Sequence, residues 1–268
     1  MPSPRTRTEL ATIIGIVVAV GSIFMTTVLN TGGLEAMKGL LHLGPVVLIV
    51  GGTVGVTFIS YPLSDLKRMP ALIWQTIQPP DLRMQATIDF ITELADQARR
   101  KGILSLQDEA VRAPDPFLAR GINLLVDGTD SETIYTVLSS EIKLETARQR
   151  RLAGMFETAG GYAPTIGIIG TVMELVHVLP NMSDATKLGQ SIAGAFLATF
   201  YGIVTANYFW LPIGKKLKTQ AAARENYGEM VIEGLLLILD GQASRFLRER
   251  LVAYLDAPPA IPRRGSAL

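Results

Sequence analysis

The chain has 268 residues, of which 48% are hydrophobic and 18% are charged, and its formal net charge is +1. This composition is too apolar for an ordinary soluble domain and too charged for a chain embedded entirely in lipid. The absence of cysteine excludes disulfides, thiolate metal sites and a cysteine nucleophile, and two histidines are too few for a histidine-rich metal site. We therefore expect a membrane protein with a large part outside the bilayer and with no metal or cofactor.

Four apolar stretches are long enough to cross a bilayer as helices, since a span needs roughly 20 residues for a hydrocarbon core about 30 Å thick. The first, Leu10–Leu29, is too long for the apolar part of a signal peptide and lacks a clear cleavage site, so we expect it to remain as an anchor. The other predicted spans are residues 40–61, 153–179 and 191–213.

Basic residues predict the orientation of these spans. They cluster before the first span, between the second and third, and after the fourth, whereas the two remaining loops hold only Lys38 and Lys187. Because cytoplasmic loops carry the excess of lysine and arginine, both termini and the middle segment are expected to be cytoplasmic.

The segment between the second and third spans is expected to be helical. Met84, Ile88, Ile91 and Ala95 recur at helical spacing, and Gly102 suits the end of that helix. A short helix is predicted within "DPFLARGINLLVDGTD", and a longer one begins near the sequence "DSE" at residue 130. This last helix is predicted to run unbroken into the third span, because no proline interrupts it before that span.

The fourth span is expected to continue across Pro212 into an amphipathic C-terminal helix, followed by a disordered tail, "DAPPAIPRRGSAL". No strand or internal repeat is predicted, so the fold class is an all-α membrane protein. Four parts are expected: the first two spans (1–61), a cytoplasmic helical domain (62–152), spans three and four (153–213), and the C-terminal helix and tail (214–268).

Small residues mark one face of each of the last two spans, where they allow close helix packing in lipid. In the fourth span these are Gly194, Ala198, Gly202 and Ala206, and in the third they are Ala163, Gly167 and Gly170. Glu174 and His177 continue the stripe of the third span, so Glu174 is expected to face protein. It is either a group of an ion pathway, acting as an outer gate, or a structural residue bonded to His177 or to a neighbouring helix.

Two threonines and two prolines lie in the same spans. Thr171 and Thr199 can each bond a backbone carbonyl of their own helix, or together line a hydrophilic path. Pro164 and Pro212 each remove a helical hydrogen bond, as a tolerated kink or as a hinge. Apart from Glu174, no span carries a deep acidic or basic residue, so a titrating group for ion movement would come from a partner.

Residues 160–218, "GGYAPTIGIIGTVMELVHVLPNMSDATKLGQSIAGAFLATFYGIVTANYFWLPIGKKLK", closely resemble the third and fourth spans of the MotA family of flagellar motor stator subunits. The four-span order, the large segment after the second span and the glycine-rich first spans match as well. The core "GIIGTV" is shared with the related TolQ and ExbB proteins, which have three spans. The span count therefore favours the MotA branch over those relatives.

The resemblance implies an ion-conducting complex in the bacterial inner membrane that turns the flagellar rotor. Five such subunits would surround two copies of a MotB-like, single-span partner anchored to peptidoglycan, and ions would pass between the partner's aspartate and spans three and four. By motif position, Thr171 and Thr199 match pathway-lining residues, and Pro164 and Pro212 match the prolines that couple ion flow to movement. Neither an enzyme activity nor nucleic-acid binding is expected.

In the family, an arginine and a glutamate in the motif R-x-x-G-x-x-x-L-E face the rotor. The rotor partner implied for this chain is a FliG-like switch protein. The corresponding stretch here is "RRKGILSLQDE", in which Arg99 matches the arginine and Gln107 stands in place of the glutamate. The acidic role would then pass to Asp108 or Glu109, or to other charges. Glu174 is a second departure, since the family usually has a small residue there.

Two other functions remain open at this point. One is an energiser of an outer-membrane system, as in TolQ and ExbB, and the other is a membrane scaffold without transport. The sequence also leaves open whether the ion would be H⁺ or Na⁺.

Overall fold

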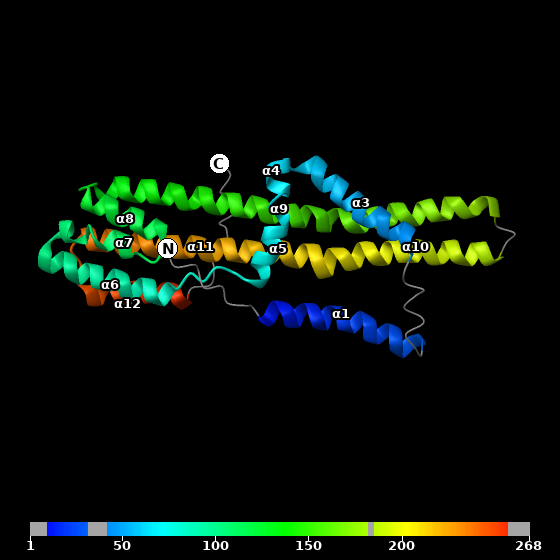
Figure 1. Cartoon of the computed structure of the whole chain (residues 1–268), viewed down its shortest axis with the longest axis horizontal. Helices are drawn as coiled ribbons and strands as arrows, with labels where there is room; N and C mark the ends of the chain where they lie inside the picture. Colours follow the sequence, from blue (N-terminus) through cyan, green and yellow to red (C-terminus); the bar gives the residue numbers. More distant parts are fainter. Residues whose placement is uncertain (1–9, 32–41, 182–184, 257–268) are drawn as a thin grey trace, which may run out of the picture. The chain divides into compact units, whose positions relative to one another are not determined.

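The structure is a computed structural model that describes residues 10–31, 42–181 and 185–256 (Figure 1). Within these ranges the secondary structure is helical and contains no strand. Four helices are long and apolar enough to cross a membrane. The predicted fold class is therefore confirmed. Of the tail predicted to be disordered, Asp256 is the last residue of α12, and the other residues lie outside the described ranges.

The helices group into two compact units. The first, here called the membrane unit, comprises Met1–Pro80 with Arg150–Lys218, and the second, here called the polar unit, comprises Asp81–Gln149 with Thr219–Leu268. The long helix α9 (Ser131–Val178) contributes residues to both, as does α11 (Leu211–Leu239). Each unit is described in turn.

The membrane unit contains all four spans. The first two predicted spans form α1 and α3, close to the predicted limits, and the short helices that follow them were not predicted from the sequence. Apolar side chains of α1 are largely exposed, as expected for a helix that faces lipid. The helices of this unit other than α9 are α1 (Leu10–Thr31), α3 (Leu43–Ser60), α4 (Leu63–Leu66), α5 (Met69–Ile77) and α10 (Ala185–Thr205).

The third and fourth spans both continue beyond the apolar region, as predicted. Helix α9 is one helix of 48 residues with Pro164 inside it. The fourth span consists of α10, a π-helical turn η3 (Ala206–Trp210) and the start of α11, which contains Pro212. Proline lacks an amide donor and its ring collides with the carbonyl one turn earlier, and a wider π turn is one way in which a helix accommodates such a defect.

The polar unit is built around one apolar core. The predicted face of α6 (Met84–Lys101) is confirmed, because Ile88, Ile91 and Ala95 are buried and Met84 packs against the core. Gly102 ends α6 with a φ of 83°, a conformation that favours glycine. The other helices of this unit are η1 (Ile103–Leu106), α7 (Glu109–Arg112), α8 (Pro116–Val126), α12 (Ser244–Asp256) and the relevant parts of α9 and α11.

Aspartates fix the starts of two of these helices. The carboxylate of Asp115 accepts a hydrogen bond from the backbone amide of Phe117 at 2.6 Å, and α8 begins there. The carboxylate of Asp130 accepts bonds from the amide and the hydroxyl of Thr133, at 2.9 and 2.7 Å. Side-chain acceptors at this position satisfy amides that the first turn of a helix leaves free. The predicted start of α9 near residue 130 is thus confirmed.

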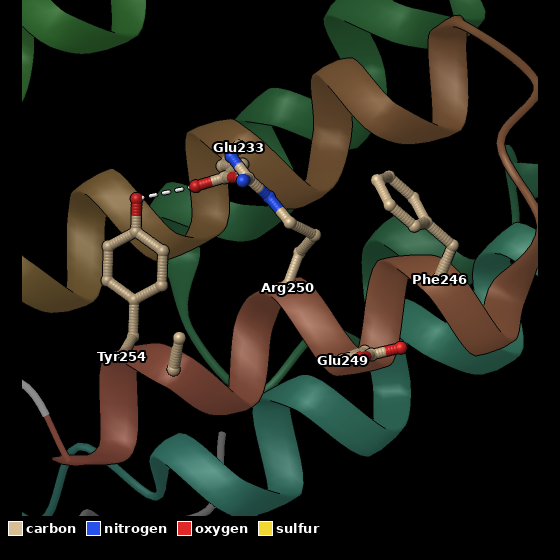
Figure 2. A pocket seen from close by; sticks show the side chains of 6 residues that line it. Glu233, Phe246, Glu249, Arg250 and Tyr254 are labelled. Atoms are coloured by element: carbon tan, nitrogen blue, oxygen red, sulfur yellow. Dashed lines mark hydrogen bonds and ion pairs between the residues drawn. The ribbon is translucent and has the colours of Figure 1, made fainter.

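The C-terminal amphipathic segment turns back on itself and forms two helices, where the sequence had suggested one. The chain reverses at Gly241, whose φ of 66° suits glycine, and α12 then packs against α6. Figure 2 shows how Tyr254 and Arg250 of α12 both reach Glu233 of α11. The Tyr254 hydroxyl donates to one carboxylate oxygen at 2.6 Å, and Arg250 pairs with the other at 2.7 Å. Burial and the bond to this carboxylate raise the pKa of Tyr254.

Arg224 joins three helices of the polar unit. From α11 its guanidinium pairs with Asp115 before α8 at 2.8 Å and with Glu145 of α9 at 3.3 Å. The same group lies over the rings of Phe117 and Tyr227. Burial acts to lower the pKa of Arg224, but the charges of Asp115 and Glu145 outweigh that effect and raise it. A charge that is this well paired adds to the packing of the three helices, and its loss leaves two carboxylates uncompensated.

We expect the substitution Arg224→Met in the full-length chain to destabilise the polar unit by roughly 2–3 kcal/mol, less than for a fully buried pair because Glu145 is partly exposed. Circular dichroism during heating in detergent should show a lower midpoint for the helical transition. Arg248→Met is the matched control, because its pair with Asp89 is about half-exposed on both sides. Equal midpoints for the two variants would contradict the role given to Arg224.

Candidate functional site

The contact between α9 and α10 depends on glycines at which a side chain would meet the backbone of the other helix. A Cβ atom at Gly167 would lie 2.9 Å from the carbonyl oxygen of Ala198. A Cβ atom at Gly202 would lie 2.6 Å from the carbonyl oxygen of Ala163. Both distances are shorter than van der Waals contact and involve backbone atoms that cannot move aside alone. The predicted small-residue faces therefore pack together, as expected for close helix pairs in lipid.

This contact brings together two of the predicted site residues. The Cα atom of Thr199 lies 3.2 Å from a Cβ built at Gly167, and the Cα atom of Pro164 lies 3.2 Å from one built at Gly202. Thr199 on α10 and Pro164 on α9 thus flank a single helix–helix contact. The contact covers about one helical turn on each side, from Ala163 to Gly167 and from Ala198 to Gly202.

The two threonines differ in their hydrogen bonding. The hydroxyl of Thr171 donates to the carbonyl oxygen of Ile168 in its own helix at 2.6 Å. This is the local bond that threonine commonly makes in helices. The hydroxyl of Thr199, which is half-buried, bonds to no other residue within the described ranges. Of the two hydroxyls, only that of Thr199 still has a proton free to donate, whereas both oxygens keep lone pairs that can accept.

Pro212 lies at the other end of the same helix pair. It follows Trp210 and Leu211, and a Cβ atom at Gly160 of α9 would lie 3.2 Å from the Cβ of Trp210 and 2.7 Å from the Cγ of Leu211. Gly160 precedes Pro164 by one turn. Each proline thus lies beside a point where the two helices approach closely. A bend at either proline therefore displaces the facing helix as well.

Two ion pairs of the membrane unit lie next to the apolar part of α9. Arg151 of α9 pairs with the buried Asp65 of α4 at 3.1 Å, and Lys218 of α11 pairs with Glu157 of α9 at 2.5 Å. Charged pairs of this kind belong at the boundary of the hydrocarbon region, where water and headgroups remain available. Glu157 therefore marks one end of the third span.

Glu174 lies against α10, as predicted. It is half-buried, whereas its neighbours Met173 and Leu175 are exposed. A Cβ atom at Gly194 would lie 3.3 Å from the Cδ of Glu174 and 3.5 Å from both carboxylate oxygens. His177, which was expected on the same face, is exposed because it lies in the last turn of α9, beyond the contact with Gly194. Among the described residues, Glu174 forms no hydrogen bond or ion pair with His177 or with a neighbouring helix.

The predicted rotor-facing residues lie where α6 ends and α8 begins, on a segment here called the tip (residues 99–112). Its η1 and α7 are held in place by the buried Leu106 and Ala110, and Gln97 of α6 donates to the carbonyl oxygen of Ser105 at 2.7 Å. Arg99 is exposed at the start of the tip. The tip is therefore a fixed part of the polar unit that presents its remaining side chains outward.

The two candidate acids of the tip are not equivalent. The side chain of Glu109 is 15% exposed, and Arg112 binds both of its oxygens, at 3.0 and 3.2 Å. Asp108 is exposed, and within the described residues its carboxylate has no partner. Asp108 is the acid that is free to meet a partner's cation, whereas Glu109 already neutralises a neighbouring arginine.

Two apolar side chains of the tip were not recognised from the sequence. Leu104 is 73% exposed and Val111 is 90% exposed, close in sequence to Asp108. The sequence feature that could have identified them is the presence of large apolar residues in a short, turn-rich and charged segment. Exposed apolar groups among charges are typical of surfaces that bind other proteins.

No group of three or more histidine, aspartate or glutamate side chains suited to a metal occurs in the described parts of the chain. The pocket in Figure 2 is lined by Glu233, Glu249, Arg250, Tyr254 and Phe246. Its central carboxylate, that of Glu233, is already bonded to Tyr254 and Arg250. This pocket therefore connects α11 to α12 and leaves little free bonding capacity for a ligand.

The chain is similar in sequence to a known family and to known proteins. A family model described as the MotA/TolQ/ExbB proton channel family matches residues 109–230. Motility protein A of Bacillus subtilis (strain 168) is 32% identical over 250 residues, which cover 93% of this chain and 92% of that protein. The protein YtxD of the same organism is 34% identical over 232 residues, which cover 87% and 85% of the two chains.

A solved structure is similar over nearly the full length as well. In the flagellar MotAB stator complex from Bacillus subtilis, one chain superposes with a TM-score of 0.85 and 31% identity, covering 92% of this chain and 96% of that one. The matching family is described as a proton channel family, and one relative is named a motility protein; this family is not a family of enzymes. On these grounds the chain, a multi-pass membrane protein, belongs to the MotA/TolQ/ExbB proton channel family, in the flagellar stator branch of Motility protein A.

Proposed function

We propose that this protein is a stator subunit that, with a MotB-like partner, conducts ions across the inner membrane and converts the ion motive force into torque on the flagellar rotor. The observation that carries the proposal is the glycine-based contact of α9 and α10, which places Thr199 and Pro164 together. Conduction and mechanical coupling would then use the same pair of helices. The four-span architecture favours this role over that of a TolQ/ExbB-like energiser or a scaffold.

The partner would supply the titrating group. Beyond Glu157, which marks one end of the third span, the only acidic residue in the described apolar parts of the spans is Glu174, and it lies far from the middle of the helix pair. An ion crossing a low-dielectric region needs a charged or strongly polar group on its way. Thr199, with its unpaired hydroxyl, and Thr171 one turn beyond Gly167 would line the path, and an aspartate from the single-span partner would carry the charge.

The prolines would allow the helices to change shape when that aspartate gains or loses its ion. Pro164 interrupts the hydrogen bonding of α9, and Pro212 follows the π turn of the fourth span. Helices bend most readily at such defects. Since both lie beside close contacts between the two helices, bending at one requires an adjustment in the other.

The tip would contact a FliG-like rotor switch protein. Arg99 and Asp108 offer exposed charges of opposite sign, and Leu104 and Val111 add apolar surface. In this proposal Asp108 takes the acidic role, because Glu109 is bonded to Arg112. Mixed charge and apolar contacts would allow binding that is specific but brief, as a turning rotor requires.

The assembly proposed is a homopentamer around two copies of the partner, in the bacterial inner membrane. The basic residues favour cytoplasmic termini and a cytoplasmic position for residues 62–152 and 214–268. Residues 1–61 and 153–213 would then hold the spans, with the ion pathway in the second of these ranges.

Deletion of the gene in a strain without a second stator should leave flagella assembled but paralysed. Flagella would be counted by electron microscopy and rotation followed in tethered cells, and the wild-type gene on a plasmid should restore it. Speed measured against sodium concentration, and with a protonophore, would identify the ion. Normal swimming of the deleted strain would contradict the proposal.

Pro164→Ala should leave the complex assembled but reduce torque by about tenfold or more, because a regular helix resists the bending that coupling requires. Torque would be measured as rotation speed under high load, and assembly by membrane fractionation and co-purification with the partner. Pro116→Ala is the control, since Pro116 occupies the first position of α8, where proline replaces no helical bond. Unchanged torque in the Pro164 variant would show that this residue is not a hinge.

Asp108→Lys should impair rotation much more than Glu109→Gln, with swimming speed lowered several-fold by the first and little by the second. The reason is that only Asp108 presents a free carboxylate, whereas Glu109 serves Arg112. Swimming speed and the amount of membrane-bound complex would be measured together. The reverse order of effects would return the rotor-facing role to Glu109.

A further inference from the structure

The short helices α4 and α5 begin where the second span leaves the hydrocarbon. The hydroxyl of Tyr61, which follows α3 directly, shares a hydrogen bond with the hydroxyl of Thr158 of α9 at 2.9 Å. Four residues later, Asp65 of α4 pairs with Arg151 of α9 at 3.1 Å. A tyrosine hydroxyl and a charged pair are typical of the boundary between hydrocarbon and water. Both short helices therefore start at that boundary.

One side of α5 packs against the helices that continue past this boundary. Its side chains Met69, Leu72 and Ile73 lie against a buried cluster of residues from α9 and α11. Near the end of α5, the carbonyl oxygen of Thr76 accepts a hydrogen bond from the hydroxyl of Thr12 of α1 at 3.4 Å. In Figure 1, α5 runs across α9 and α11 instead of along them. It therefore follows the boundary from the end of the second span to the start of the first.

The opposite side of α5 is exposed and yet apolar. Pro70, Ala71 and Trp74 share this side, and Trp74 is 60% exposed. A helix that faces water usually carries polar side chains on its exposed face. Tryptophan is enriched where membrane and water meet, because its ring is apolar and its indole N–H is polar. This side of α5 thus has the composition expected of a helix that contacts the headgroup region of a lipid layer.

The exposed side is continuous with the lipid-facing surface of the second span. Ile59, in the last turn of α3, is 87% exposed, and three residues separate it from the exposed Leu63 of α4. Leu63 is followed within the same segment by the exposed side of α5. A lipid molecule beside the end of α3 would therefore also reach α4 and α5, so the bilayer itself is the occupant that suits this surface.

Two basic residues give the surface a preference among lipids. Lys67 and Arg68 lie between α4 and α5 and are exposed, and neither has an ion-pair partner among the described residues. The carboxylate nearest to them in sequence, that of Asp65, is already paired with Arg151. Basic residues at a membrane surface attract anionic headgroups, and each one raises the affinity by about fivefold.

We propose that Lys67, Arg68 and Trp74 form a binding surface for an anionic phospholipid, in the leaflet at which the second span ends. The two cations bind the headgroup phosphate and give charge selectivity. Trp74 lies at the level between headgroup and acyl chains, and Leu63 contacts the chains. The inference concerns the membrane unit alone and depends on neither ion conduction nor torque.

Trp74 can itself report which lipid lies beside it. The chain has two tryptophans, so Trp210→Phe leaves Trp74 as the single one. This full-length variant would be reconstituted in bilayers of equal parts phosphatidylglycerol and phosphatidylcholine, with bromine on the acyl chains of one lipid or of the other. Bromine quenches tryptophan fluorescence on contact. The quenching should give a relative association constant of about tenfold in favour of phosphatidylglycerol, and this preference should fall at high salt.

The double substitution Lys67→Gln and Arg68→Gln, in the same background, should reduce the preference to nearly onefold. The summed quenching by the two lipids should stay unchanged, because the apolar side still meets lipid. The matched control is Arg100→Gln with Lys101→Gln, which removes the same charge from two exposed residues at the end of α6 and should keep the preference.

A second measurement avoids the substitution of Trp210. The chain with its native tryptophans, extracted in mild detergent from membranes that contain phosphatidylglycerol, should retain several-fold more of this lipid than the Lys67 and Arg68 double variant. The Arg100 and Lys101 double variant should retain as much as the unsubstituted chain.

Three results would overturn the proposed surface. Equal quenching of Trp74 by the two lipids would show contact without charge selectivity, and an equal preference in the two double variants would remove the role of Lys67 and Arg68. Weak quenching by both lipids would show that another protein chain, such as a second copy, covers Trp74. Because no measurement here involves rotation or ion flow, failure of this surface and failure of the proposed function are separate results.

Discussion

The close approach of α9 and α10 is the constraint on which the rest of the membrane unit depends. At Gly167 and Gly202 the backbone of one helix lies so near the other that even a methyl group would meet a carbonyl oxygen. In lipid there is little hydrophobic driving force between helices, so van der Waals contact over such short distances provides much of the association. The positions of Thr199, Pro164 and Glu174 relative to the facing helix all follow from this contact.

Much of this arrangement could be predicted from residue types and their spacing. The length of the apolar stretches predicted the spans, and the regular spacing of small residues predicted the helix contact. The lack of a proline before Pro164 predicted the continuity of α9. The start at Asp130 and the end at Gly102 were readable because capping depends on local chemistry alone.

Other features depend on contacts between distant residues and could not be read in this way. In the sequence, Gly241 is not distinguishable from a glycine inside a helix. The reversal of the chain there is evident only from the contacts of Arg250 and Tyr254 with Glu233. The difference between Asp108 and Glu109 arises from Arg112, and sequence spacing alone does not say which of two adjacent acids forms that pair. The position of His177 past the end of the helix contact likewise depends on where α10 begins.

Charged residues are distributed unequally between the polar unit and the spans. Several arginines of the polar unit pair with carboxylates, as Arg224 does with Asp115 and Glu145, and these pairs stabilise its fold. The spans, by contrast, hold almost no charge, which keeps them stable in lipid but leaves them without a group that can carry an ion. Under the proposed function, such a chain would conduct only when a partner supplies that group, and an unassembled subunit would not leak ions.

The exposure of α1 has a consequence of a different kind. Its contacts within the chain are few and involve α5, the π turn and Lys216 of α11, and its apolar side chains otherwise face outward. Close-packed helices keep their place through their own side chains, but α1 is held chiefly by its preference for hydrocarbon over water. The thickness and composition of the surrounding bilayer thus help to determine the position of α1.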